Sequence, residues 1–124
     1  MSNLGARISA VGPGTTEIVV DFDTRLTQQH GYLHGGAVTS LADSAAGYAA
    51  LTLFPSDVGV LTTEFKVNFL RPAAGSQFIA RGSVLKPGRT LTVCQADVFA
   101  QTGTSEAHVL TGLFSMMTVT GITD

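Results

Sequence analysis

The sequence predicts an α+β protein in which an antiparallel sheet wraps around one long helix. Two observations lead to this prediction. A single helical pattern spans residues 35–54, and four strand patterns follow it with only short turns between them. Strands joined by short turns pair in antiparallel fashion, and one helix can cover a face of the resulting sheet. The helix is rich in glycine and alanine, so the sheet can approach it closely.

The strands follow one another in a regular order along the chain. Residues 1–11 are weakly patterned and allow either a short strand or a helical turn, and a turn at Gly12-Pro13-Gly14 ends them. Alternating apolar and polar residues predict a strand over residues 15–23. Further strands are predicted over residues 58–70, 77–85, 91–100 and 107–119. The last of these is apolar on both faces, which predicts a central place in the sheet.

The predicted helix contains one charged residue, Asp43, among small and apolar ones, and Pro55 ends it. A helix that is apolar on all sides is expected to be buried. Burying a carboxylate is costly unless it is paired or hydrogen-bonded. Asp43 is therefore a candidate for chemistry, the alternative being an ordinary solvent-facing residue. At 3.6 residues per turn it shares a thin face, open to close approach by another backbone, with Gly36, Thr39, Ser40, Gly47 and Ala50.

The composition predicts one domain over residues 1–124, large enough to bury a core. Charged residues make up 13% of the chain, which is too few to cover a lone monomer, so we expect a homo-oligomer. The net charge of −2 gives no indication of nucleic acid binding. We expect neither a membrane-spanning nor a secreted protein. The single cysteine, Cys94, fits a reducing, cytoplasmic location and is expected to be a buried strand residue.

Two motifs resemble those of one protein family. Residues 34–43 read His-Gly-Gly-Ala-Val-Thr-Ser-Leu-Ala-Asp, and residues 67–72 read Val-Asn-Phe-Leu-Arg-Pro. Together with the element order and length, they resemble the hotdog-fold acyl-CoA thioesterases of the phenylacetic-acid-degradation (PaaI-like) group, in the 4-hydroxybenzoyl-CoA thioesterase superfamily. The resemblance implies hydrolysis of an acyl-CoA substrate without a metal or other cofactor. It also implies a dimer with joined sheets, often paired again into a tetramer.

The resemblance suggests roles for four residues near the helix start. Asp43 would act as nucleophile or as general base, two roles that the sequence does not separate. The backbone N–H of Gly35 would polarise the thioester carbonyl from the positive end of the helix, and glycine there permits close approach of substrate. Gln28 matches an amide side chain that orients water or the thioester. His34 is expected to support the loop by hydrogen bonding.

Helix geometry predicts that the site is shared between subunits. Gly35 and Asp43 are eight residues apart, about 12 Å along one helix axis, so they cannot meet within one chain. Two helices related by a two-fold axis can bring Asp43 of one chain to Gly35 of the other. Thr62 matches a hydroxyl that helps to place the attacking water. Thr63 competes with it for this role because the strand register is not known from the sequence.

Substrate binding is predicted mainly at two turns. Positive charge and free N–H groups at turns suit the phosphates of coenzyme A. The alternative for Lys86 and Arg89 is that they are ordinary solvent-exposed residues at the ends of a hairpin. The predicted substrate-binding residues are Gly36, Thr63, Asn68, Arg71, Lys86 and Arg89.

Several alternatives remain open. His30 and His34 have the spacing of a metal pair, but glycines between them oppose a helix and no third ligand stands nearby, so no metal is expected. His108 is expected to be a strand residue without chemistry. The acyl group, aromatic or medium-chain, would depend on the depth of the pocket. Pocket depth would in turn depend on the strand register and on side chains of the partner subunit's helix, with Tyr48 or Leu51 as candidates. The alternative function is a non-catalytic hotdog module that binds acyl-CoA, although such a module has no need of a carboxylate in the helix.

Overall fold

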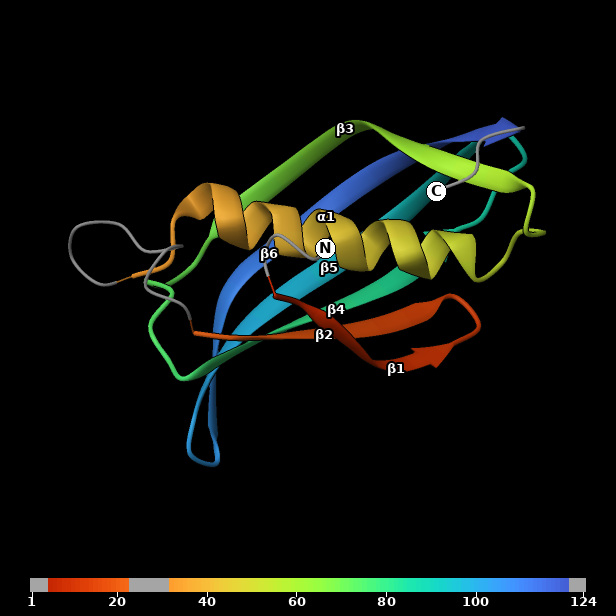
Figure 1. Ribbon diagram of the computed structural model, residues 1–124. Coiled ribbons are helices and arrows are strands. Elements are labelled where there is room, and N and C mark those ends of the chain that lie inside the picture. The colour runs from red at the N-terminus through yellow and green to blue at the C-terminus, as the bar shows by residue number, and fades with distance from the viewer. Residues whose placement is uncertain (1–4, 23–31, 121–124) are drawn as a thin grey trace.

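The computed structural model describes residues 5–22 and 32–120, in which one helix lies across one face of a six-stranded sheet (Figure 1). All neighbouring strands pair in antiparallel fashion, in the order β1-β2-β4-β5-β6-β3. The α+β prediction is therefore confirmed. The elements are β1 (Arg7–Gly12), β2 (Thr15–Asp21), α1 (Gly35–Leu51), β3 (Val58–Phe69), β4 (Gln77–Lys86), β5 (Leu91–Thr102) and β6 (Ser105–Thr120).

Helix α1 ends three residues earlier than the sequence pattern predicted. It stops at Leu51, and the N–H groups of Leu53 and Phe54 each bond to a carbonyl three residues back. Pro55 explains this end, because it has no N–H for the Leu51 carbonyl and its ring would clash with that carbonyl. The predicted helix over residues 35–54 is thus corrected to Gly35–Leu51.

The predicted central place of β6 in the sheet is confirmed, but only one of its two apolar faces is covered within the chain. The strand lies between β5 and β3. Its side chains toward α1, among them Leu110, Phe114 and Met116, are buried. On the opposite face Leu113 is 51% exposed and Met117 is 38% exposed. The strand therefore has one covered face in the single chain, and its apolar outer face remains open.

The close approach of helix and sheet depends on small residues in both. The side of α1 that faces the sheet is fully buried and consists mainly of alanine. A Cβ built at Gly82 of β4 would stand only 2.4 Å from the Ala45 carbonyl oxygen, so only glycine fits there. The expected close packing is confirmed. The buried residues of α1 are Val38, Leu41, Ala42, Ala45, Ala46, Ala49 and Ala50.

The expectation that α1 is buried on all sides was wrong for the single chain. Gly36, Ser40 and Tyr48 are exposed on the side away from the sheet, and Asp43 is half-buried at its margin. Ala50, which the helical pattern placed on the thin face, is instead buried. One layer of sheet can cover only one side of a helix. The other side is left as a surface of small residues.

Cys94 lies fully buried on β5, as predicted. Burial disfavours the thiolate and raises the pKa of the Cys94 thiol to about 11. Over residues 5–22 and 32–120, no helix has the length and apolarity needed to cross a membrane.

Candidate functional site

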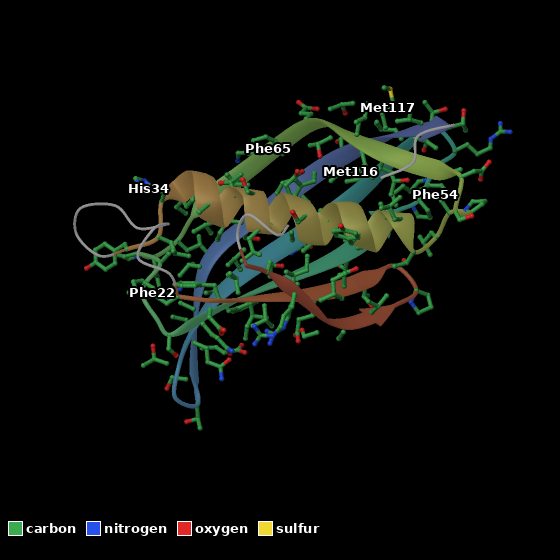
Figure 2. All side chains as sticks on the ribbon, in the orientation of Figure 1. Phe22, His34, Phe54, Phe65, Met116 and Met117 are labelled. Carbon is green, nitrogen blue, oxygen red and sulfur yellow. The ribbon has the colours of Figure 1, made fainter. Side chains whose placement is uncertain are left out.

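Asp43 and Thr62 meet where α1 passes β3. The Thr62 hydroxyl donates a hydrogen bond of 2.6 Å to Asp43 Oδ1. The two residues line a cavity of about 450 Å³ together with Thr39, Ser40, Thr63, Glu64 and Phe65. Figure 2 shows Phe65 on β3, beside the half of α1 that begins near His34. The carboxylate is thus hydrogen-bonded and borders an open cavity. Both features reduce the free-energy cost of placing a charge in an apolar helix.

A β-bulge decides which of the two adjacent threonines reaches Asp43. Thr62 pairs with Met116 and Glu64 pairs with Ser115, so Thr63 is the extra residue of β3. The Thr63 hydroxyl donates to the Ser115 carbonyl at 3.2 Å. Of the two candidates left open by the sequence, the structure therefore places Thr62 on the carboxylate.

A second, smaller cavity lies on the other side of Asp43. It holds about 180 Å³ and is lined by Tyr48, Leu51 and Met116, among others. The two residues that the sequence suggested for pocket depth therefore both lie beside the carboxylate. The Met116 sulfur also lies 3.2 Å from the Thr62 hydroxyl, a contact that the sequence did not indicate.

Among the described residues, no side chain caps the N-terminus of α1. His34 occupies the capping position, makes no side-chain capping bond, and accepts the Val38 N–H at 3.1 Å through its carbonyl. No acidic residue stands in the first turn. The N–H groups of Gly35, Gly36 and Ala37 therefore present the positive end of the helix, with no acidic side chain in the turn itself. The expected role of His34 in the preceding loop stays a prediction.

The two motifs of the sequence come together at this helix start. Gly35 and Arg71 line one cavity of about 550 Å³. Arg71 is held there by a hydrogen bond of 2.9 Å from its Nη1 to the His108 carbonyl. The other lining residues are Tyr32, Leu33, Val38, Phe69, Leu70, Pro72, Ala73 and Val109.

Within one chain, Asp43 and Gly35 line separate cavities. That the two residues meet between two copies of the chain stays a prediction. β3 is an edge strand of the sheet, and Leu61, Phe65 and Phe69 on it are each at least half exposed. A long apolar edge of this kind favours pairing with another chain.

The remaining predicted residues are not gathered around Asp43 or Gly35. Asn68 lines a cavity of about 320 Å³ with Lys66, Gln95 and Thr111. The hairpin that carries Lys86 and Arg89 joins β4 to β5, at the opposite end of the sheet from the end of β3.

A Cβ added at Gly36 meets no heavy atom of the described residues within 4 Å. Gln28 and His30 fall outside the described residues. In the described part of the chain, no three His, Cys, Asp or Glu side chains group as metal ligands would. That no metal or other cofactor takes part stays a prediction.

Two features were not anticipated from the sequence. The Phe69 ring packs beside Gly35 at the helix start, and the second motif contains this residue without indicating its contact. On the sheet, His108 Nε2 lies 2.9 Å from Asp97 Oδ1, and its ring stacks on Phe99 at 4.6 Å between centroids. Asp97 lies on β5 and His108 on β6, so predicting their pairing would have required the register between the two strands.

Comparison with known proteins gives one family. The family model of the Thioesterase superfamily matches residues 30–107. A putative esterase of Saccharolobus solfataricus is 35% identical over 102 residues, which cover 82% of this chain and 66% of that protein. The chain thus spans about two thirds of that relative's length. The 1,4-dihydroxy-2-naphthoyl-CoA hydrolase of Escherichia coli is 29% identical over 100 residues, covering 81% of this chain and 74% of that one.

Solved structures show the same fold. A thioesterase family protein from Silicibacter pomeroyi superposes with a TM-score of 0.95 at 48% identity, over 98% of this chain and 89% of that one. The PaaI protein of the E. coli phenylacetic acid degradation operon superposes with a TM-score of 0.88 over 99% and 86% of the two chains. At 21% identity the latter shows the fold alone. The predicted resemblance to hotdog-fold, PaaI-like thioesterases is confirmed.

Proposed function

The chain belongs to the Thioesterase superfamily, which makes thioester hydrolysis its class of reaction, and we propose that it hydrolyses an acyl-CoA to the free acid and coenzyme A. The observation that carries this proposal is the Asp43 carboxylate, hydrogen-bonded by Thr62 at 2.6 Å and bordering two cavities. A carboxylate held in one orientation beside an open cavity suits attack on a thioester or activation of water.

In this proposal the complete site forms between two copies of the chain. Pairing of two β3 edge strands around a two-fold axis would join the sheets and bring the open sides of two α1 helices together. The small residues Gly36, Ser40 and Gly47 on that side allow the helices to approach. Asp43 of one copy then faces the helix start at Gly35 of the other.

The chemistry follows from these two half-sites. Acting as general base, Asp43 takes a proton from water while the water oxygen bonds to the thioester carbon. The carbonyl oxygen gains negative charge and accepts hydrogen bonds from the Gly35 N–H. The C–S bond then breaks, and the thiol of coenzyme A leaves with a proton. Acting as nucleophile, Asp43 would instead bond to the thioester carbon, and the C–S bond would break to release coenzyme A. Water would then hydrolyse the resulting anhydride to the free acid and the Asp43 carboxylate. Thr62 occupies Oδ1, so we assign the reaction to Oδ2.

Support for the substrate class comes from the cavities and from one relative. Arg71 shares the cavity of Gly35, and we assign it to the coenzyme A part of the substrate, with Lys86, Arg89 and Asn68 as further candidates. The small cavity beside Asp43 suits a compact acyl group, aromatic or medium-chain. The name of the E. coli relative at 29% identity specifies an aromatic acyl-CoA. The proposal includes a cytoplasmic location and pairing of dimers into a tetramer.

The test is release of free thiol from a panel of aromatic and straight-chain acyl-CoAs. Asp43→Asn keeps the shape of the side chain and its acceptor for Thr62 but removes the base. We expect kcat to fall about 100-fold or more. Asp57→Asn, an exposed residue in the turn after α1, is the matched control and should match the wild type.

Two outcomes would contradict the proposal. Equal thiol release by the wild type and Asp43→Asn would remove Asp43 from the chemistry. Tight acyl-CoA binding with no thiol release by either protein would favour the alternative, a non-catalytic hotdog module that binds acyl-CoA.

A further inference from the structure

An aromatic ring lies beside the place where Gly35 would carry a side chain. A Cβ built at Gly35 would stand 3.2 Å from Cζ and 3.4 Å from Cε1 of Phe69, and the first of these contacts is tighter than an ordinary one. Phe69 is the last residue of β3, and the next N–H, of Leu70, bonds to the Val109 carbonyl at 2.8 Å. The end of β3 therefore places the ring beside the helix start.

This contact changes how the helix start can be approached. The sequence suggested that glycine at this position lets the substrate come close to the backbone. Instead the ring lies on the Cβ side of Gly35, whereas a Cβ at Gly36 would meet no heavy atom of residues 5–22 and 32–120 within 4 Å. Among these residues, the Gly36 side is thus the freer approach to the first-turn N–H groups, with the ring as a wall on the Gly35 side.

Phe69 and Phe65 lie on the same face of β3 and are similarly exposed, but they line different cavities. Phe65 stacks on the buried Phe114 with 5.6 Å between ring centroids and lines the cavity of Asp43. Phe69 lines the cavity of about 550 Å³ together with Gly35 and Arg71. Of the two rings, that of Phe69 is therefore the one beside the helix start.

We propose that Phe69 is a positioning residue for the thioester, an inference that rests on the proposed function. Its ring restricts the thioester carbonyl to one approach to the N–H groups of Gly35 and Gly36. The same ring excludes water from one side of these donors. Hydrogen bonds to a developing negative charge are stronger where water is excluded.

A double-mutant cycle on Gly35 and Phe69 tests this inference. Gly35→Ala forces the ring to shift by a few tenths of an ångström, and we expect kcat to fall about tenfold with a smaller change in KM. Phe69→Leu should also lower kcat. In the Phe69→Leu background the added methyl has a flexible neighbour, so Gly35→Ala should then cost less than about twofold.

Equal costs of Gly35→Ala in both backgrounds would overturn the inference, because glycine would then be needed for the substrate itself. Phe65→Leu is the matched control, in whose background the full tenfold loss should persist. Phe69→Met replaces Phe69→Leu if the latter does not fold, as judged by thermal unfolding of every variant. If the wild type releases no thiol from any acyl-CoA, the proposed function fails. If it turns over and the costs are equal, only the role of Phe69 fails.

Discussion

Thr62 and Thr63 are adjacent in sequence and identical in chemistry, yet only Thr62 donates to Asp43. The difference arises from the bulge in β3, which sends the second hydroxyl to the Ser115 carbonyl. Replacing either threonine by valine removes the same hydroxyl group, so the two variants form a matched comparison.

We expect Thr62→Val to lower kcat for acyl-CoA hydrolysis about tenfold, because a hydrogen bond to a charged group is worth roughly 1.5–3 kcal/mol. Thr63→Val should leave kcat within about twofold of the wild type, as its bond goes to a backbone carbonyl. Initial rates of thiol release at saturating substrate measure both. The reverse order of effects would show that the bulge is not where the structure places it.

Burial of Cys94 gives a second prediction, on pH. The pKa of the buried thiol is raised to about 11, above its ordinary value of 9.0, so the folded state keeps a proton that the unfolded chain loses. This contribution to stability is complete below pH 9 and is lost as the pH rises toward 11. Urea unfolding from pH 7 to pH 10.5 should show an additional fall in the free energy of unfolding above pH 9. The fall should be absent in Cys94→Ala, and its persistence there would assign it to another group.

At the scale of the elements, α1 and β4 approach so closely that backbone meets backbone. Gly82 stands opposite Ala45, with no room for a Cβ on the strand. On the other side of the helix, Gly47 has room within one chain, since an added Cβ would lie 4.0 Å from Val60. The two glycines therefore differ in the space that one chain leaves for a methyl group.

We expect Gly82→Ala to lower the free energy of unfolding by about 1–3 kcal/mol, because helix and sheet must separate to admit the methyl group. Gly47→Ala should lower it by less, because within one chain the added methyl group has room beside Val60. Urea unfolding of both variants checks this. A neutral Gly82→Ala would mean that the helix lies farther from β4 than the structure shows.

At the scale of the whole molecule, the proposed site requires two chains. Asp43→Asn and Gly35→Pro each damage a different half of the site, the second by removing the N–H of Gly35 and adding ring atoms beside Phe69. A mixed dimer of the two variants keeps one site in which both halves are intact. We expect co-expression of the two inactive chains to restore about a quarter of the wild-type activity, since half of randomly formed dimers are mixed.

The control is co-expression of Asp43→Asn with Asp43→Ala, which damages the same half twice and should restore nothing. Native mass spectrometry confirms that mixed oligomers form. Mixed oligomers without recovered activity would place the whole site within one chain.

The alternation and the turns of this chain were sufficient to predict β2 to β6, the single helix and antiparallel pairing, because periodicity is a local property of the sequence. The weak pattern of residues 1–11 left a strand and a helical turn open, and the structure has β1 there. The same local information singled out Asp43 as the one charge in an apolar helix and Gly35 as the residue at its start. It was insufficient at the helix end, where the clash of Pro55 with the Leu51 carbonyl acts four residues back.

The sequence by itself thus determined the elements and the two chemical groups, carboxylate and helix start, which each reside on a single stretch of chain. Only the tertiary structure decided which side chains accompany them: Thr62 on Asp43, and Phe69 against Gly35. It also decided that β3 is the open edge of the sheet. The physical reason is that contacts between distant segments depend on strand register, and one extra residue at Thr63 reverses which side chains face the helix.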